Sequence, residues 1–223
     1  MRSLLLALRS AYHARNGYHN FAHATDVLQA TYTFLVALEI APPLNSIYSS
    51  RVSQSQERWQ RPEHVMRSCA IGQILRPMDV FALMIAAIGH DVGHPGLSNA
   101  YMVNARTPVA QVYGDKSVLE NFHTVTLIQM LRKHGLGHLF GPSTRAPSAH
   151  DPECRKVLFA SILATDMGRH FPFVSKLQDL GRQSSGTIAR PDNVEEVRLL
   201  LCSGLMKCAD ISNPVCRFLL LLE

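Results

Sequence analysis

The chain has 223 residues, of which 47% are apolar and 17% are charged. This length suits a single domain, and the apolar content excludes a chain that is disordered throughout. The formal net charge of +5 comes from scattered basic residues that form no continuous stripe, so a nucleic-acid-binding surface is not predicted.

The cysteines and the short apolar runs indicate the compartment. Five cysteines, an odd number with no C-x-x-C pair, argue against a disulfide framework and against a thiolate zinc site. The apolar runs 4–8 and 218–222 are too short for a signal-peptide core or a membrane span. We therefore expect a cytoplasmic chain with no membrane contact, and the sequence leaves its oligomeric state open.

Helical periodicity dominates the first half of the chain. Apolar positions recur every three or four residues over 21–40, which predicts a helix that the pair Pro42-Pro43 ends. Residues 42–64 are rich in Ser, Gln, Arg and Pro and are predicted to form an exposed loop or insertion. A helix over 80–88, with Asp79 as its N-cap, is apolar on all sides and is expected at the centre of the fold.

The second half predicts three more helices. The pattern S-V-L-E at 117–120 is typical of a capping box and opens a helix that runs to His134 and stops at Gly135. We then expect a loop over 141–152, a helix over 153–167 and a third loop over 180–193. The pattern D-N-V-E at 192–195 predicts another capping box, which starts a helix that reaches about Cys208. Since no strand-like alternation and no repeat occur, the predicted fold class is all-α.

Histidines and aspartates gather in four groups at or near predicted helix ends. The groups are Y-H-N-F-A-H-A-T-D-V at 18–27, G-H-D-V-G-H-P-G at 89–96, A-T-D-M at 164–167 and C-A-D-I-S-N-P at 208–214. Polar groups at the ends of apolar helices are costly to bury unless they are paired or bound to metal. Two imidazoles and two carboxylates from different helices suit a divalent ion that keeps open positions for water. The aspartate of the adjacent His90-Asp91 pair could also reach a second ion about 3.5–4 Å from the first, as in phosphoryl chemistry.

These motifs resemble a known family. In order, Y-H-N-x-x-H-A-x-D-V, H-D-x-x-H-P-G, L-E-N-x-H, A-T-D-M and C-A-D-I-S-N-P resemble the catalytic domain of class I 3′,5′-cyclic nucleotide phosphodiesterases, a branch of the HD-domain metal-dependent phosphohydrolases. The resemblance runs from Tyr18 to Pro214 and implies a compact multi-helix bundle. The insertion at 42–64, and Phe122 where animal members typically carry a second histidine, indicate a fungal-like member.

The resemblance implies a role for each matching residue. The protein ligands of a tightly bound ion, expected to be zinc, would be His23, His90, Asp91 and Asp210. Asp91 would also reach a second ion, magnesium or manganese, and the two ions would hold a bridging hydroxide that attacks phosphorus. His19 would protonate the leaving 3′ oxygen as a general acid, which gives a nucleoside 5′-monophosphate.

The remaining matches would surround the ions and the substrate. His94, Glu120 and Thr165 would hydrogen-bond to water on the second ion. Asn213 would face the purine, and Met167 would line the pocket. Some of these residues also have ordinary interpretations: Glu120 is the third residue of the predicted capping box, and His19 or His123, taken alone, could be a core or surface histidine.

Two departures from the family pattern bear on function. The Y-H-N motif falls at residue 18, where the family has a preceding helical segment, and the chain lacks the continuation that carries the purine-binding glutamine and aromatic clamp. We therefore expect 1–223 to be one phosphodiesterase domain, truncated at both ends and incomplete at the C-terminus, which does not distinguish cAMP from cGMP as substrate. Two alternatives stay open, namely another HD-domain phosphohydrolase and a truncated remnant that binds metal or a partner without catalysis.

Overall fold

The computed structural model describes residues 1–47, 59–68, 70–140, 152–183 and 194–220. These residues form helices joined by short connections, and no β-strand occurs in these ranges. The all-α prediction is therefore confirmed. Among the same residues, no helix combines the length and the hydropathy needed to cross a bilayer.

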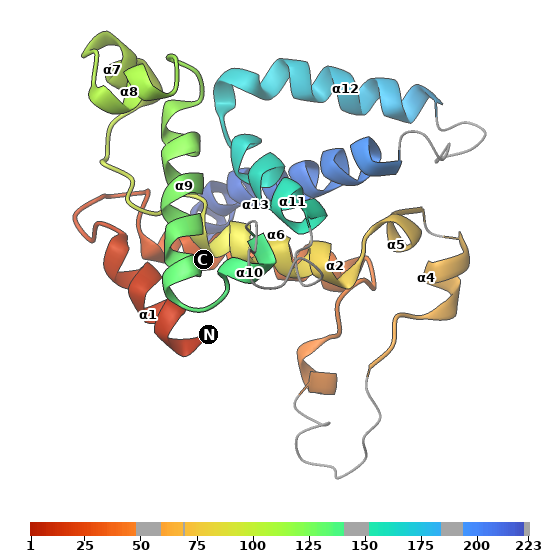
Figure 1. Cartoon of the computed structure of the whole chain (residues 1–223). Helices are drawn as coiled ribbons and strands as arrows, with labels where there is room; N and C mark the ends of the chain where they lie inside the picture. Colours follow the sequence, from red (N-terminus) through yellow and green to blue (C-terminus); the bar gives the residue numbers. More distant parts are fainter. Residues whose placement is uncertain (48–58, 69, 141–151, 184–193, 221–223) are drawn as a thin grey trace.

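Four helices form the centre of the molecule (Figure 1). They are α2 (Phe21–Ala37), α6 (Pro77–Gly89), α11 (Pro152–Leu163) and α13 (Val194–Leu220). The main packing contacts run in the order α2, α6, α11, α13 and back to α2, and α6 also contacts α13. On α6, Ala82, Ala86 and Ala87 are fully buried, so neighbouring helices approach this helix closely. The predicted central position of this segment is confirmed.

Further helices surround this centre. Beside it lie α1 (Arg2–Ala11), α9 (Val118–Lys133) and α10 (Gly137–Phe140), and the further helices are α4 (Glu63–Ser68), α5 (Ala70–Ile74), α7 (Asn99–Asn104), α8 (Pro108–Val112), η2 (Met167–Arg169) and α12 (His170–Gln183). Figure 1 shows α12 along the outside of the molecule, next to α11 and α13. Where α9 packs on α6, a Cβ atom at Gly89 would lie 2.6 Å from Leu127 Cδ1, so any larger residue there would force Leu127 to shift.

The end of α2 differs from the prediction. The helix stops at Ala37, and Glu39 adopts a left-handed backbone with φ 55°. The N–H groups of Ile40 and Ala41 then both donate to the carbonyl of Leu35. Because the chain reverses before it reaches the prolines, the prediction that Pro42-Pro43 ends the helix was wrong.

The start of α6 also lies earlier than predicted. Arg76 is the N-cap and Pro77 occupies the first helical position, where its missing N–H is no loss. Asp79 is the third helical residue, and its Oδ2 accepts from the backbone N–H of Arg76 at 2.8 Å. The prediction of Asp79 as N-cap was wrong, although it does stabilise this helix end.

At α9 the boundaries agree with the prediction but the cap does not. Ser117 lies in the left-handed region with φ 43° and makes no side-chain cap hydrogen bond. Its hydroxyl donates instead to Asp166 Oδ2 at 2.7 Å, so the predicted capping box was wrong. The helix ends as expected, with Gly135 at φ 81° and the N–H of Leu136 donating to the carbonyl of Leu131.

The last three predicted segments are shifted. The helix predicted over 153–167 ends at Leu163, before the A-T-D-M motif, and α12 extends to Gln183, so the loop predicted from residue 180 was wrong over 180–183. The final helix continues past Cys208 to Leu220 and carries the C-A-D-I-S-N-P motif inside it. Of the predicted loops, residues 48–58, 141–151 and 184–193, with Asp192 of the predicted capping box, lie outside the described part of the chain. At the described edges of these loops, residues 44–47 are helical, α4 begins at Glu63 and α11 begins at Pro152, so the loop predictions were wrong there.

Candidate metal centre and active-site cleft

The first predicted histidine ligand is placed by a helix cap. Asn20, in the Y-H-N motif, is the N-cap of α2, and its Oδ1 accepts from the N–H groups of Ala22 and His23 at 3.0 and 3.1 Å. This cap fixes the start of α2, so His23 lies in the first turn with its side chain buried against the end of α6. The local sequence thus sets the position of this imidazole.

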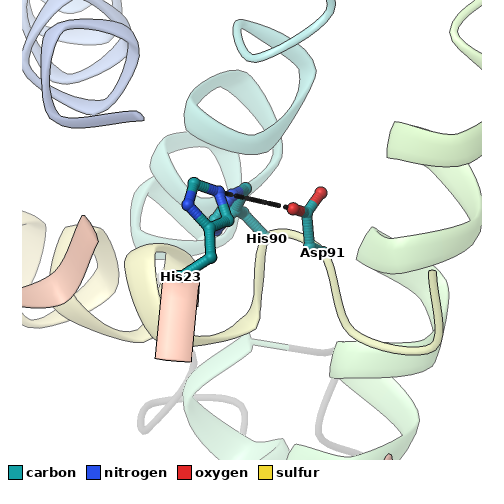
Figure 2. Close-up of side chains that lie close together, drawn as sticks. All are labelled: His23, His90 and Asp91. Carbon is teal, nitrogen blue, oxygen red and sulfur yellow. Dashed lines mark hydrogen bonds and ion pairs between the residues drawn. The ribbon is translucent and has the colours of Figure 1, made fainter. Parts of the chain in front are cut away.

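The predicted ligands converge at one point. Figure 2 shows the rings of His23 and His90 close together, with the Asp91 carboxylate directed toward them. His23 Nε2 lies 3.2 Å from His90 Nε2, 3.6 Å from Asp91 Oδ2 and 3.1 Å from Asp210 Oδ1. His90 Nε2 lies 3.3 Å from Asp91 Oδ2 and 3.4 Å from Asp210 Oδ1. Ligand atoms bound about 2.0–2.2 Å from one ion, at neighbouring corners of an octahedron or tetrahedron, are about 2.8–3.6 Å apart, so these separations fit a shared ion.

The hydrogen bonds of His90 and Asp91 also fit a cation. His90 Nδ1 lies 2.9 Å from the carbonyl of Ala87, which can only accept, so the neutral ring carries its proton on Nδ1 and presents a lone pair on Nε2. Asp91 Oδ2 faces this nitrogen, is buried and makes no hydrogen bond. A buried carboxylate oxygen that faces an imidazole lone pair is unsatisfied unless a positive ion lies between them.

Both carboxylates carry negative charge in this setting. Burial raises the pKa of Asp91, but the imidazoles of His90, His123 and His19 outweigh it and hold this pKa well below its usual value. Burial likewise opposes ionisation of Asp210, while the neighbouring imidazoles of His23 and His90 lower its pKa well below the usual value. The centre therefore combines two carboxylates with imidazole nitrogens, a donor set that suits a divalent ion.

Two side chains from the N-terminal region support this centre and were missed by the sequence analysis. The hydroxyl of Tyr12 donates to the carbonyl of Ile88 at 3.0 Å and accepts from the N–H of Asp91 at 3.3 Å. The amide of Asn16 donates to the carbonyl of His19 at 3.1 Å and of His94 at 2.9 Å, which ties two motif loops together. Only the apolar face of helix α1 could have pointed to Tyr12, and no sequence signal pointed to Asn16.

A second cluster adjoins the first through Asp91. Ligand atoms of Asp91, His94 and His123 all lie within 4.8 Å of one another, and all three residues are buried. His123 Nδ1 lies 2.8 Å from the carbonyl of Val92, so Nε2 presents a lone pair; it makes no hydrogen bond and lies 3.8 Å from Asp91 Oδ1. Two buried acceptors therefore face each other, which again fits a cation or a water donor between them.

His94 has the opposite orientation. Its Nδ1 accepts from the N–H of Gly96 at 3.0 Å, so the neutral ring carries its proton on Nε2 and acts there as a donor. Burial lowers the pKa of both His94 and His123 to about 4, which keeps both rings neutral near pH 7. His123 was expected to be an ordinary histidine when taken alone; its place in the L-E-N-F-H motif was the available signal.

An open cleft of about 750 Å³ lies above these groups. Of the predicted site residues, those along its wall are His19, Asp91, His94, Glu120, Thr165, Met167 and Asp210, and His123 joins them. The ring of His19 is half-buried and stacks on that of His94, with centroids 4.0 Å apart and planes 7° from parallel. Burial lowers the pKa of His19 below its ordinary value. His23 and His90 are buried and do not line this cleft.

The remaining predicted residues have defined partners. Both carboxylate oxygens of Glu120 accept from Asn99 Nδ2, at 3.1 and 2.9 Å, and burial raises the pKa of Glu120. The hydroxyl of Thr165 donates to the carbonyl of Ile162 at 2.8 Å, which leaves its lone pairs as acceptors. Met167 is 58% exposed at the rim of the cleft. Asn213 lies in α13, and its side chain is outside the described part of the chain.

The fold and the site together define an all-helical protein with a candidate divalent-metal centre at the floor of an open cleft. Residues 18–221 match the family profile described as 3′5′-cyclic nucleotide phosphodiesterase. The chain belongs to this family.

Named relatives agree with this assignment. The chain is 33% identical over 211 residues to the probable 3′,5′-cyclic phosphodiesterase pde-6 of Caenorhabditis elegans. This match covers 94% of the chain and 23% of that protein. It is 32% identical over 213 residues to the 3′,5′-cyclic-nucleotide phosphodiesterase regA of Dictyostelium discoideum. This match covers 96% of the chain and 22% of that protein. The chain thus spans less than a quarter of the length of these curated relatives.

Solved structures show the same fold. The yeast caPDE2 crystal structure superposes with a TM-score of 0.70 at 33% identity, over 95% of this chain and 39% of that one. The phosphodiesterase domain of the RhoPDE fusion protein from the choanoflagellate Salpingoeca rosetta superposes with a TM-score of 0.66 at 29% identity, over 96% of this chain and 55% of that one.

Proposed function

We propose that this chain hydrolyses 3′,5′-cyclic nucleotides to nucleoside 5′-monophosphates. The observation that carries the proposal is the spacing of the ligand atoms: the Nε2 atoms of His23 and His90 lie 3.1–3.6 Å from each other and from carboxylate oxygens of Asp91 and Asp210, which suits one shared ion. Membership of the phosphodiesterase family supplies the substrate class. The proposal covers cAMP and cGMP alike.

Two divalent ions fit the donor sets. The four residues named above would hold the first ion, and mixed nitrogen and oxygen ligands favour zinc. The other carboxylate oxygen of Asp91, with the His123 lone pair nearby, would serve a second ion that keeps most of its water, which favours magnesium or manganese. Once bound, the ions would neutralise charge on the phosphodiester and make water nucleophilic near neutral pH.

The protein groups around the ions would orient the reactants. His19 lies at the cleft wall within reach of solvent, where its imidazolium form would give a proton to the leaving 3′ oxygen. His94 would donate from Nε2, while Glu120 and Thr165 would accept hydrogen bonds from water. Asn213 would face the purine, and the exposed side chain of Met167 would line its entrance.

The test is hydrolysis of cyclic AMP and cyclic GMP by the purified chain, with metal analysis of the same sample. Turnover that EDTA abolishes and that added zinc and magnesium restore would support the proposal. Bound metal without turnover of any cyclic nucleotide would favour a non-catalytic metal- or partner-binding protein. Turnover only of other phosphoesters in a substrate panel would favour another HD-domain phosphohydrolase.

A cytoplasmic location stays a prediction. Cys154, Cys202 and Cys208 are thiols rather than disulfide partners, which suits a reducing compartment. Fractionation of cells that express the tagged chain would test the location.

A further inference from the structure

The turn at 164–167 forms one edge of the cleft and is held by two other helices. It joins α11 to η2 and carries Thr165 and Met167, which both line the cleft. Its backbone hydrogen bonds are local: the N–H of Ala164 donates to the carbonyl of Ala160, that of Thr165 to the carbonyl of Ile162, and that of Arg169 to the carbonyl of Asp166. The position of this edge relative to α9 and α13 therefore depends on side-chain contacts.

The first of these contacts is a buried lysine on α13. Lys207 is only 3% exposed, which is rare for an ammonium group unless its donors are used. Its Nζ donates to the carbonyl of Ala164 at 2.8 Å and lies 3.4 Å from the carbonyl of Asp166 and 3.7 Å from Met167 Sδ. Three acceptors for three N–H donors satisfy this ammonium within the turn.

The second contact comes from the N-terminus of α9. The hydroxyl of Ser117 donates to Asp166 Oδ2 at 2.7 Å, and Asp166 Oδ1 accepts from the N–H of Gly168 at 2.8 Å. Ser117 has φ 43°, a backbone conformation that a non-glycine residue holds only where its surroundings impose it. Here the imposed conformation directs the hydroxyl away from its own helix and onto the turn.

Each of the three residues stands next to a residue of the cleft. Ser117 directly precedes α9, whose third residue is Glu120, and Lys207 precedes Asp210 by three residues on α13, so Lys207 and Asp210 share a helix face. Asp166 lies between Thr165 and Met167 and itself lines the cleft. Loss of the bonds from Ser117 or Lys207 would therefore let the turn shift relative to Glu120 on α9 and Asp210 on α13.

From this arrangement we infer that Ser117, Asp166 and Lys207 form a positioning group, the 164–167 clamp, which fixes the substrate-facing edge of the cleft relative to the metal centre. The inference rests on the proposed function. None of the three residues supplies a predicted metal ligand, so the clamp acts on the geometry of substrate binding and leaves metal occupancy unchanged.

The decisive experiment compares the full chain with its Lys207→Met variant. Hydrogen–deuterium exchange of peptides over 164–169 is expected to rise by about 10- to 100-fold, because hydrogen bonds from a charged donor are lost. Zinc content is expected to stay at the wild-type value, while kcat/KM falls by about 10²-fold through a raised KM. Lys207→Arg should recover part of both losses, and Lys176→Met, which removes an exposed lysine of α12, should change neither.

A second variant tests that the group acts as a unit. Ser117→Ala should raise exchange over the same peptides, and its combination with Lys207→Met should raise it by less than the product of the two single effects. Three results would each overturn the inference. They are unchanged exchange over 164–169, loss of zinc from the Lys207→Met variant, and an equal rise of exchange in α2 and α6. If the wild-type chain lacks turnover, the proposed function fails, but exchange and zinc content still decide whether the clamp exists.

Discussion

At the scale of single residues, the hydrogen bond at Nδ1 of each histidine determines whether its Nε2 acts as a donor or as an acceptor. Backbone carbonyls of Ala87 and Val92 hold the protons of His90 and His123 on Nδ1, which leaves Nε2 as a lone pair in each ring. The N–H of Gly96 reverses this arrangement in His94. Three histidines in similar motifs thus divide into two acceptors and one donor.

The metal ligands and the general acid should separate in mutants. Asp210→Ala removes a carboxylate from the centre and is expected to lower zinc content and abolish turnover. His19→Ala leaves the centre intact and is expected to retain zinc while kcat falls by about 10²–10⁴-fold. Elemental analysis and steady-state kinetics on both variants provide the measurement. Equal zinc loss in the two variants would contradict this division of roles.

His123 should matter to the second ion alone. Because its Nε2 is buried, orphaned and 3.8 Å from Asp91 Oδ1, His123→Ala is expected to weaken manganese binding by about 10- to 100-fold while zinc content is retained. Titration with manganese, followed by electron paramagnetic resonance, measures the effect. His138→Ala, which removes an exposed histidine of α10, is the matched control. Wild-type manganese affinity in the His123 variant would show that His123 does not contribute to binding of the second ion.

The same histidine sets an expectation for pH. With a pKa of about 4, His123 is almost wholly neutral at both pH 6 and pH 8, so its lone pair stays available across this range. A histidine with an ordinary pKa near 6.5 would be about three-quarters protonated at pH 6. Manganese affinity should therefore change by less than about twofold between the two pH values. A loss of about fourfold or more at pH 6 would show that the burial of His123 does not lower its pKa.

At the scale of the helices, a buried arginine joins three of the four central elements. Arg198 of α13 forms ion pairs with Glu153 of α11 and, with Nε to Oδ2 at 3.8 Å, with Asp79 of α6. Asp79 is fully buried and also pairs with Arg76, at the end of α6 opposite to His90. These ion pairs therefore stabilise one end of the helix bundle, and the metal ligands converge at the opposite end.

Removal of this arginine should cost stability. Arg198→Ala leaves the buried carboxylate of Asp79 with one partner fewer and is expected to lower the free energy of unfolding by about 3 kcal/mol. Urea denaturation of the metal-loaded chain measures the change. Arg182→Ala breaks an exposed pair with Asp179 and is expected to cost less than about 1 kcal/mol. A similar loss in the two variants would mean that the buried ion pairs of Arg198 contribute no more to the free energy of unfolding than an exposed pair does.

Helix positions were predictable where local pattern and tertiary packing agree. The apolar segment around Leu83 and the glycine stop at Gly135 were both identified, because each depends on residues close in sequence. The end of α2 was not, since it depends on a left-handed Glu39 and on burial of Ile40 against distant helices. The capping box at Ser117 failed for the same reason, because a partner 49 residues away took its hydroxyl.

The site was predictable to a different degree. The residues His23, His90, Asp91 and Asp210 were all proposed as ligands, and the structure brings them together. That prediction depended on the order of several motifs, since spacing within any single motif does not show that distant helices meet. Support from Tyr12 and Lys207 lay beyond the sequence, because a buried tyrosine and a buried lysine show no local signal until their partners are known.

At the scale of the whole molecule, the metal centre connects helices that are far apart in the chain. Its ligands come from α2, from the turn after α6 and from α13. Any ion bound there favours the folded state over the unfolded one, since the unfolded chain does not hold the ligands together.

Metal should therefore stabilise the whole fold. Zinc at 100 times its dissociation constant is expected to raise the free energy of unfolding by about 2.7 kcal/mol over the EDTA-treated chain. Thermal unfolding with and without zinc measures this difference. The Asp210→Asn variant should lose most of the zinc-dependent shift, because one ligand oxygen becomes a weakly binding amide. A full shift in that variant would place the stabilising ion elsewhere.

The spread of the ligands along the chain also has a consequence for biosynthesis. During translation His23, His90 and Asp91 leave the ribosome well before Asp210, which lies in the last described helix. Until α13 is made, the nascent chain carries only three of the four ligands, and the cleft lacks one of its walls. Zinc capture would thus follow the synthesis of α13, and the earlier helices must associate through their apolar faces without help from the ion.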